Sequence, residues 1–363
     1  MSRRSALLAT VAWCATASTP AMASTVARSR PAAGRLRTDI WEDDFSSGFS
    51  TDGPGAKWAF LPFGAGVGQD GVATTSSDGL RIVSSGTHSG TGKPAFKLTV
   101  GQNDPGGLPG SLDHVKYLVY ANVKGGSGQL GFDVDPGEEL ICESWMSGVT
   151  YGTEGHPFGS AVLDAAADPR LASSCLAMED LDTAVAFEFS LTNEFVYVYY
   201  ERLPNNREKL GNYASFLYSI PVARRAPDDQ HHVKISYDRS RGLVRWFLEG
   251  KEVFRVDKIG HLLPSRRYLV SDHGGTEEKV EPRQLACGMG MFNILDAAQP
   301  GRAGSGLVRL NTDSDFYYDP VVGPPRAETF VDEVSLVGNR LFGQGASLHM
   351  RKISVTTKRA GLV

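Results

Sequence analysis

Short runs of apolar residues, either alternating with polar ones or continuous, recur along most of the chain. Examples are residues 80–83 (Leu-Arg-Ile-Val) and 95–100 (Ala-Phe-Lys-Leu-Thr-Val). Glycine, proline, asparagine and aspartate separate the runs, and this spacing is typical of short strands joined by tight turns. Many short strands in succession predict an all-β sandwich or barrel. Further runs of the same kind lie at 115–123, 130–134, 139–146, 185–191, 195–202, 215–222 and 232–237.

One hairpin and one closing strand are the clearest local predictions. The runs 243–248 and 252–256 flank a turn that contains Gly250, which can adopt the positive φ that a tight turn between twisted strands requires. Residues 348–356 largely alternate between apolar and polar side chains and predict a last strand. Helical periodicity is weak, and 161–176 is the best candidate for a short helix.

The first residues carry the pattern of an export signal. Arg3 and Arg4 precede a mostly apolar stretch at 6–17, and Ala21-Met22-Ala23 has the small-x-small form that a signal peptidase reads. The apolar stretch is shorter than the roughly 20 residues that a bilayer core requires, which argues against a membrane anchor. We therefore predict a secreted protein that has no membrane association after cleavage, exported by the general or the twin-arginine route.

The same patterns divide the chain into four segments. We predict a signal peptide at 1–23, a flexible basic lead-in at 24–38, a single β-sandwich domain at 39–357 and a C-terminal tail at 358–363. Hydrophobic residues make up 41% of the chain and charged residues 21%, which suffices for a buried core. A formal net charge of −4 lacks the basic footprint of a nucleic-acid binder, so no nucleic-acid partner is expected.

Three cysteines remain once Cys14 leaves with the signal peptide. Cys142, Cys175 and Cys287 do not have the spacing of a zinc site. An oxidising compartment would allow one disulfide and leave one thiol free, and the sequence does not select the pair. Three buried free thiols are the alternative.

Three local patterns resemble the concanavalin A-like jelly roll, the sandwich of legume lectins and laminarinase-type glucanases. They are Trp41 to Phe45 with Trp58 and 78–82, then 231–237 leading into the predicted hairpin, and then the final strand at 346–355. The resemblance covers roughly 39–357 and implies a jelly-roll β-sandwich with long loops, within a secreted bacterial family. Because this fold carries lectins, hydrolases, lyases and inert modules, function depends on the site.

The segment 139–146 is similar to the catalytic strand of laminarinase-like enzymes. With a period of two, Glu139, Ile141, Glu143 and Trp145 share one strand face. Retaining glycosidases need two carboxyl groups about 5–5.5 Å apart. The resemblance implies Glu139 as nucleophile and Glu143 as acid/base, with Trp145 as a surface for a sugar ring, although Ile141 replaces the family's central aspartate. Alternatively, Glu139 ends a turn and Glu143 is a solvated strand residue.

Two further segments offer ligand-binding groups. The loop 151–158 follows the acidic strand and contains His156, which could be a general base or bind ligand hydroxyls, or merely be polar surface. The run 195–201 places aromatic side chains and a carboxylate on one strand face, which suits a sugar or a flat apolar molecule but also ordinary packing. The candidate substrate-binding residues are Trp145, Tyr151, Glu154, Tyr197, Tyr199 and Glu201.

We assign no cofactor, although a structural Ca²⁺ is possible at two acidic loops. These loops are 133–138 and 311–315, and Phe316 stands where an EF-hand loop needs glycine. The sequence contains no Gly-x-Ser-x-Gly elbow, phosphate loop or HExxH motif.

Three functions are compatible with these patterns. The first is a secreted carbohydrate-active protein, either a degenerate retaining glycoside hydrolase that uses its glutamate pair or an inactive relative that binds glycan. The second is a biosynthetic enzyme, a cyclase or isomerase, with an apolar cavity in the sandwich, and an enclosed cavity would favour it over an open groove. The third is a non-catalytic surface or adhesion module. The expected partner is a polysaccharide or a small-molecule ligand, and no pattern indicates the oligomeric state.

Overall fold

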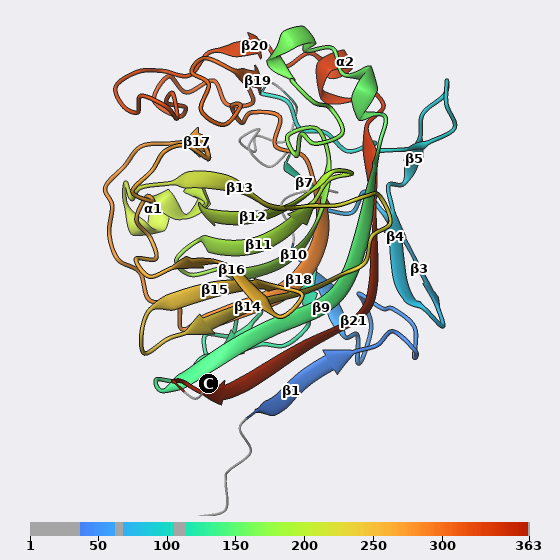
Figure 1. Ribbon diagram of the computed structural model, residues 1–363, viewed down its shortest axis with the longest axis vertical. Coiled ribbons are helices and arrows are strands. Elements are labelled where there is room, and N and C mark those ends of the chain that lie inside the picture. Colours follow the sequence, from blue (N-terminus) through green and yellow to red (C-terminus); the bar gives the residue numbers. More distant parts are fainter. Residues whose placement is uncertain (1–36, 62–67, 103, 105–113, 362–363) are drawn as a thin grey trace, which may run out of the picture. The chain divides into compact units, whose positions relative to one another are not determined.

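The computed structural model describes residues 37–61, 68–102, 104 and 114–361. The predicted signal peptide and most of the lead-in lie outside the described residues. The described part is built from two large antiparallel sheets with few helices, as Figure 1 shows, and this confirms the predicted all-β jelly-roll sandwich. No helix in these ranges is long and apolar enough to cross a membrane.

The first sheet, here called sheet A, holds eight of the described strands. Its two longest strands, β9 and β21, run side by side over most of their length (Figure 1). The strand order is β16 (Lys251–Val256), β15 (Leu243–Leu248), β14 (His231–Asp238), β9 (Glu138–Tyr151), β21 (Gly345–Arg359), β4 (Gly79–Val83) and β3 (Val72–Ser76), and β1 (Thr38–Asp43) pairs with β21.

The second sheet, sheet B, holds nine of the described strands. The order is β17 (Leu269–Asp272), β13 (Phe216–Arg224), β12 (Phe195–Arg202), β11 (Val185–Leu191), β10 (Ser173–Asp180), β18 (Gln284–Phe292), β7 (Val115–Ala121) and β2 (Trp58–Phe60), and β8 (Phe132–Asp133) pairs with β18.

The remaining elements are short and lie in the connections. Two small pairs are β19 (Gly306–Val308) with β20 (Phe330–Asp332), and β5 (Gly86–Thr87) with β6 (Pro94–Ala95). The helices are η2 (Thr153–Gly155), η3 (Gly159–Ala161), η4 (Pro204–Asn206), α1 (Arg207–Leu210) and α2 (Val337–Arg340).

Of the hairpin and the helix that the sequence predicts, the structure contains only the hairpin. The hairpin β15–β16 is confirmed, and Glu249 and Gly250 both have positive φ at its turn, as a tight hairpin between twisted strands requires. The helix predicted at 161–176 is wrong, because this segment consists of turns that lead into β10. Pro169 interrupts it, and proline disfavours helical backbone at the residue before it.

The main core lies between the two sheets. Trp246 of sheet A and Phe187 of sheet B are fully buried and meet edge to face, with ring centroids 5.8 Å apart. A disulfide between Cys142 of β9 and Cys287 of β18 also joins the sheets, while Cys175 is a buried free thiol. The pairing that the sequence left open is therefore Cys142 with Cys287.

Sheet B buries both of its faces. On β10, Leu176 and Met178 enter the main core, whereas Ala177 and Glu179 point to the opposite side, called here the outer face. Loop residues after β18, including Ile294, pack over part of the outer face. The outer face is thus covered by loops, and a polar side chain placed there is removed from bulk water.

Candidate active site

Three glutamates from neighbouring strands project from the outer face of sheet B. Glu179 lies on β10, Glu188 on β11 and Glu201 on β12. Ala186 pairs with both Glu179 and Glu201, so these two flank it in one row across the sheet. Glu188 follows Ala186 by two residues and is therefore the diagonal neighbour of both other glutamates.

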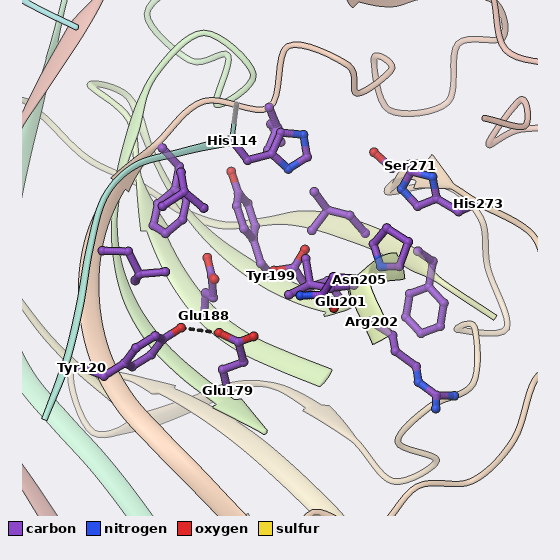
Figure 2. A pocket seen from close by; sticks show the side chains of 18 residues that line it. His114, Tyr120, Glu179, Glu188, Tyr199, Glu201, Arg202, Asn205, Ser271 and His273 are labelled. Carbon is purple, nitrogen blue, oxygen red and sulfur yellow. Dashed lines mark hydrogen bonds between the residues drawn. The ribbon is translucent and has the colours of Figure 1, made fainter. Parts of the chain in front are cut away.

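Small residues around the glutamates leave room above the sheet. Ala177 and Ala186 lie on the same face, and Gly288 of β18 pairs with Tyr120 of β7. A Cβ atom at Gly288 would stand 2.4 Å from the Tyr120 ring, so glycine allows this ring to cross the strand. Tyr120 then donates a short hydrogen bond to a carboxylate oxygen of Glu179 (Figure 2).

A cavity of about 80 Å³ opens above these side chains. Figure 2 shows the glutamates grouped together, apart from His114, from Ser271 of the edge strand β17 and from His273, which follows this strand. The cavity walls are largely apolar and come from the strands and the loops around them. These apolar residues are Val115, Leu118, Leu203, Pro204, Phe216, Leu217, Phe292 and Ile294.

Burial gives the three carboxyl groups unusual protonation. It raises the pKa of Glu179 and of Glu201 to about 7 each. For Glu201, the positive charge of His114 opposes part of this effect. Burial also raises the pKa of Glu188 well above its usual value, and the nearby charges of Glu201 and Glu179 raise it further. Near neutral pH the cavity therefore contains carboxyl groups that still hold protons.

His114 is held at the cavity by a buried acid. Its Nε2 makes a short hydrogen bond to Asp296, and Tyr317 donates to the other oxygen of Asp296 over 2.7 Å. Burial alone would raise the pKa of Asp296, but the charge of His114 and the hydrogen bonds from His114 and Tyr317 outweigh it and lower the pKa. Asp296 thus remains an anion that orients the His114 ring.

The other basic groups at the cavity are turned away or neutral. Arg202 extends away from the glutamates (Figure 2) and pairs with Glu278 at 2.8 Å. Burial lowers the pKa of His273 to about 4, so this ring is neutral near pH 7, and its Nδ1 hydrogen-bonds the Phe316 carbonyl oxygen.

The run 195–201 contributes to this site. Tyr199 and Glu201 line the cavity, and Glu201 stands beside the other two glutamates. Tyr197 lies two residues along the same strand face and lines a neighbouring hollow, where its hydroxyl donates to the Ala167 carbonyl oxygen over 2.7 Å.

The acidic strand predicted as catalytic lies in sheet A, away from this cavity. Glu139 pairs with Arg245 at 2.6 Å and with Lys358 at 3.3 Å. Glu143 pairs with His232 at 3.6 Å, and Trp145 stacks on the same ring, with centroids 4.2 Å apart. These side chains share a face as the strand period predicts, and Arg37 lies 3.3 Å from Glu143, so both carboxylates have a cationic partner.

The residues predicted on the loop 151–158 do not line the cavity either. The Tyr151 hydroxyl lies 3.1 Å from the Ser347 hydroxyl, and Glu154 is exposed. His156 accepts a hydrogen bond from the Phe158 backbone N–H through Nδ1, which holds the ring against its own loop.

Sequence reasoning missed Glu179, Glu188 and His114. A usable signal was present for the first two, because Glu188 stands in the mostly apolar run Val185–Leu191 and Glu179 directly follows the apolar residues 175–178. A charged residue at such a position has to be paired, protonated or in contact with a ligand. His114 had no local signal, since its partner Asp296 is 182 residues away in the sequence.

The predicted calcium loops form local turns. Asp313 accepts a hydrogen bond from the Asp315 backbone N–H, and Asp133 accepts one from Gly126. Among the residues that the structure describes, no group of three or more His, Cys, Asp or Glu side chains is arranged to hold a metal ion.

The fold and the cavity define a jelly-roll β-sandwich whose outer sheet face carries an enclosed, carboxyl-lined site. Residues 42–359 match the family described as "Family of unknown function (DUF6081)", and the chain belongs to this family. It is also 25% identical over 393 residues to "Uncharacterized protein L829" of Acanthamoeba polyphaga mimivirus, across 83% of this chain and 85% of that protein.

Several solved structures share a lower level of likeness. An endo-1,3-beta-glucanase from Streptomyces sioyaensis matches with a TM-score of 0.43 and 12% identity, over 91% of this chain and 99% of that one. A kappa-carrageenase from Pseudoalteromonas carrageenovora matches with a TM-score of 0.39 and 13% identity, over 93% of this chain and 100% of the carrageenase chain. At these scores the likeness carries no argument about the activity of this chain.

Proposed function

We propose that the chain is an enzyme that performs general acid–base catalysis on a small, largely apolar molecule without a negative charge, in the manner of an isomerase or cyclase. The supporting observation is the cavity of about 80 Å³ that contains three glutamates and is otherwise mostly apolar. A catalytic acid or base is most effective when its pKa is near the working pH. Burial raises the pKa of Glu179 and Glu201 to about 7, which suits such a role.

Each glutamate has a distinct role in this proposal. Glu188 lies between the other two and holds its proton most tightly, so it protonates the substrate. Glu201 is the base that accepts a proton from the substrate, because the charge of His114 favours its ionised form. Glu179, with its hydrogen bond from Tyr120, stabilises positive charge that develops on the substrate.

The shape and charge of the cavity restrict the substrate. The apolar walls suit an apolar body, and the enclosed form does not suit a long polymer lying across the sheet. A carboxylate or phosphate on the substrate would meet three acidic side chains, and its burial there would be unfavourable.

A glycan-directed activity is the second candidate function. It is supported by two cavity carboxyl groups that lie on neighbouring strands. Glycoside hydrolysis needs two carboxyl groups that face one space and a transition state with positive charge. Glu188 and Glu201 on neighbouring strands meet the first requirement, and Tyr199 lies beside them. In this case the site would take the end of a sugar chain.

Paired substitutions test the proposal. Wild-type protein, Glu188→Gln and Glu143→Gln are assayed on two panels, one of neutral unsaturated ketones and epoxides and one of 4-nitrophenyl glycosides and β-glucan oligosaccharides. We expect turnover in the first panel that falls by about 100-fold or more in Glu188→Gln, because the proton donor is lost, and persists in Glu143→Gln. Turnover of glycosides alone would support the second candidate. Loss in Glu143→Gln with full activity in Glu188→Gln would contradict both.

We also propose that the enzyme works outside the cytoplasm. The Cys142–Cys287 disulfide supports this, because such bonds persist mainly in oxidising compartments. Mass spectrometry of the culture medium should find a protein that begins at Ser24. Only intact chain inside the cells would contradict export.

A further inference from the structure

Among the described residues, no cation forms an ion pair with the three glutamates of the cavity. Buried carboxylates elsewhere are compensated within the protein. Glu139 has Arg245 at 2.6 Å, and Asp168 has Arg170 at 2.6 Å. Asp332 instead accepts hydrogen bonds from three backbone N–H groups. Compensation of this kind is general, because an unpaired buried charge is strongly unfavourable.

The three cavity glutamates differ in this respect. Among the described residues, no Lys, Arg or His nitrogen lies within 4.0 Å of their carboxylate oxygens. Tyr120 donates to Glu179, whereas within the same ranges no side chain or backbone group forms a hydrogen bond to the carboxyl groups of Glu188 or Glu201. Glu188 is only 6% exposed, so bulk water does not replace its missing partners, whereas Glu201 is half-buried.

A second polar group facing the same cavity also lacks a partner. Ser271 is 5% exposed and lines the cavity from β17, the edge strand of sheet B (Figure 2). Its hydroxyl has no hydrogen-bond partner among the described residues. Ser271 pairs with Leu217, and Leu217 pairs with Glu201, so the hydroxyl stands two strands from the nearest glutamate. A ligand between them would meet acidic groups at one end and a hydroxyl at the other.

We propose that the cavity binds an organic amine as its ammonium ion. The ammonium group supplies the positive charge that Glu179, Glu188 and Glu201 lack, and it donates hydrogen bonds to their oxygens. The apolar body of the amine contacts walls such as Leu118 and Phe292. A polar group at its far end reaches Ser271. This inference rests on the cavity of the proposed function but does not require turnover.

Binding of the ammonium ion changes the protonation of the site. Near pH 6, below the pKa of about 7 of Glu179 and Glu201, the amine enters as a cation and keeps its proton. One carboxyl group of the Glu188–Glu201 pair releases its proton to solvent, so the charge in the cavity stays constant while an ion pair forms. The other titratable groups around the cluster are His114, Tyr120, Cys175, Asp180, Tyr199 and His273, while Arg202 extends away from it.

Three probes of one shape test the proposal, namely benzylamine, benzyl alcohol and benzoate. Calorimetry on the whole chain at pH 6 measures their affinities, and a pH-stat at the same pH in unbuffered salt measures proton release. We expect benzylamine to bind at least about tenfold more tightly than benzyl alcohol, because hydrogen bonds between charged groups are stronger than neutral ones. We also expect roughly one proton released per amine bound, from the displacement described above, and no binding of benzoate.

Two variants test whether the amine binds at the cavity glutamates. Glu188→Gln should lose most of the preference for benzylamine over benzyl alcohol, whereas Glu143→Gln, in sheet A, should retain it. If benzyl alcohol or benzoate binds the wild-type protein as tightly as benzylamine, or if no proton is released, the proposal is wrong even if Glu188→Gln does not fold. Amine binding without turnover of any neutral substrate would retain this inference and contradict only the proposed function.

Discussion

Burial without a neighbouring cation distinguishes Glu179, Glu188 and Glu201 from the carboxyl groups of sheet A. Glu139 is also buried, but Arg245 and Lys358 pair with it. A carboxylate with cationic partners supports structure, whereas a carboxyl group in an apolar cavity keeps its proton and can exchange it with a substrate. The difference in surroundings, rather than residue type, separates the two acidic sets.

The pKa of Glu179 predicts a pH-dependent stability. Burial raises this pKa from about 4.3 when unfolded to about 7, so the folded state binds the proton more tightly between these values. Its contribution to the free energy of unfolding is full below pH 4 and is lost as the pH rises through 7, by roughly 3 kcal/mol. Glu179→Gln cannot ionise, so its stability relative to wild type should increase between pH 5 and pH 8. Urea unfolding at both pH values measures this, and a constant difference would contradict the assignment.

Because the Asp296 carboxylate orients the His114 ring, its removal should affect catalysis. Asp296→Asn keeps the shape but removes the charge that holds His114. We expect kcat to fall by about 10- to 100-fold, as is typical when a group that orients a catalytic partner is lost, with KM nearly unchanged. The pH profile of kcat should also shift upward, because a less firmly held His114 lowers the pKa of Glu201 less. An unchanged pH profile would mean that Asp296 has a structural role only.

The two sheets are connected at the level of elements by the disulfide between β9 and β18. Cys142 and Cys287 are 145 residues apart in the chain and belong to opposite sheets. β18 also carries Gly288, over which Tyr120 passes to reach Glu179. The bond therefore anchors the strand that shapes one side of the cavity.

Removal of this disulfide should lower stability. The double variant Cys142→Ser with Cys287→Ser is expected to lose about 2–5 kcal/mol of unfolding free energy, because a long loop is no longer closed in the unfolded chain. Thermal unfolding of the variant and of reduced wild type measures the loss, with Cys175→Ser as a control that retains the disulfide. Equal melting temperatures for all of them would contradict a stabilising role.

At the scale of the whole described unit, strands were predictable and the site was not. Strands such as β15 and β16 follow from local alternation of apolar and polar residues, which a short window of sequence contains. The pairing of Cys142 with Cys287 and the meeting of Glu188 with Glu201 depend on which strands are neighbours and in which register. No local pattern states that information.

The split of the predicted site shows the same limit. Glu139, Glu143, Tyr199 and Glu201 were each placed correctly on strands, and Glu201 lies in the cavity. The structure assigns the first two to sheet A and the last two to the outer face of sheet B. A period of two shows which residues of one strand share a face, but it does not show which sheet that strand joins.

Glutamates that stay protonated at neutral pH distinguish the cavity from the rest of the protein. A titration of the glutamate carboxyl groups measures this protonation directly. Protein with ¹³C-labelled glutamate side chains is titrated by NMR, and Glu→Gln variants assign the signals of residues 179, 188 and 201. Glu179 and Glu201 should titrate near pH 7 and Glu188 higher still. Titration of all three near the ordinary value of about 4.3 would contradict protonation at neutral pH.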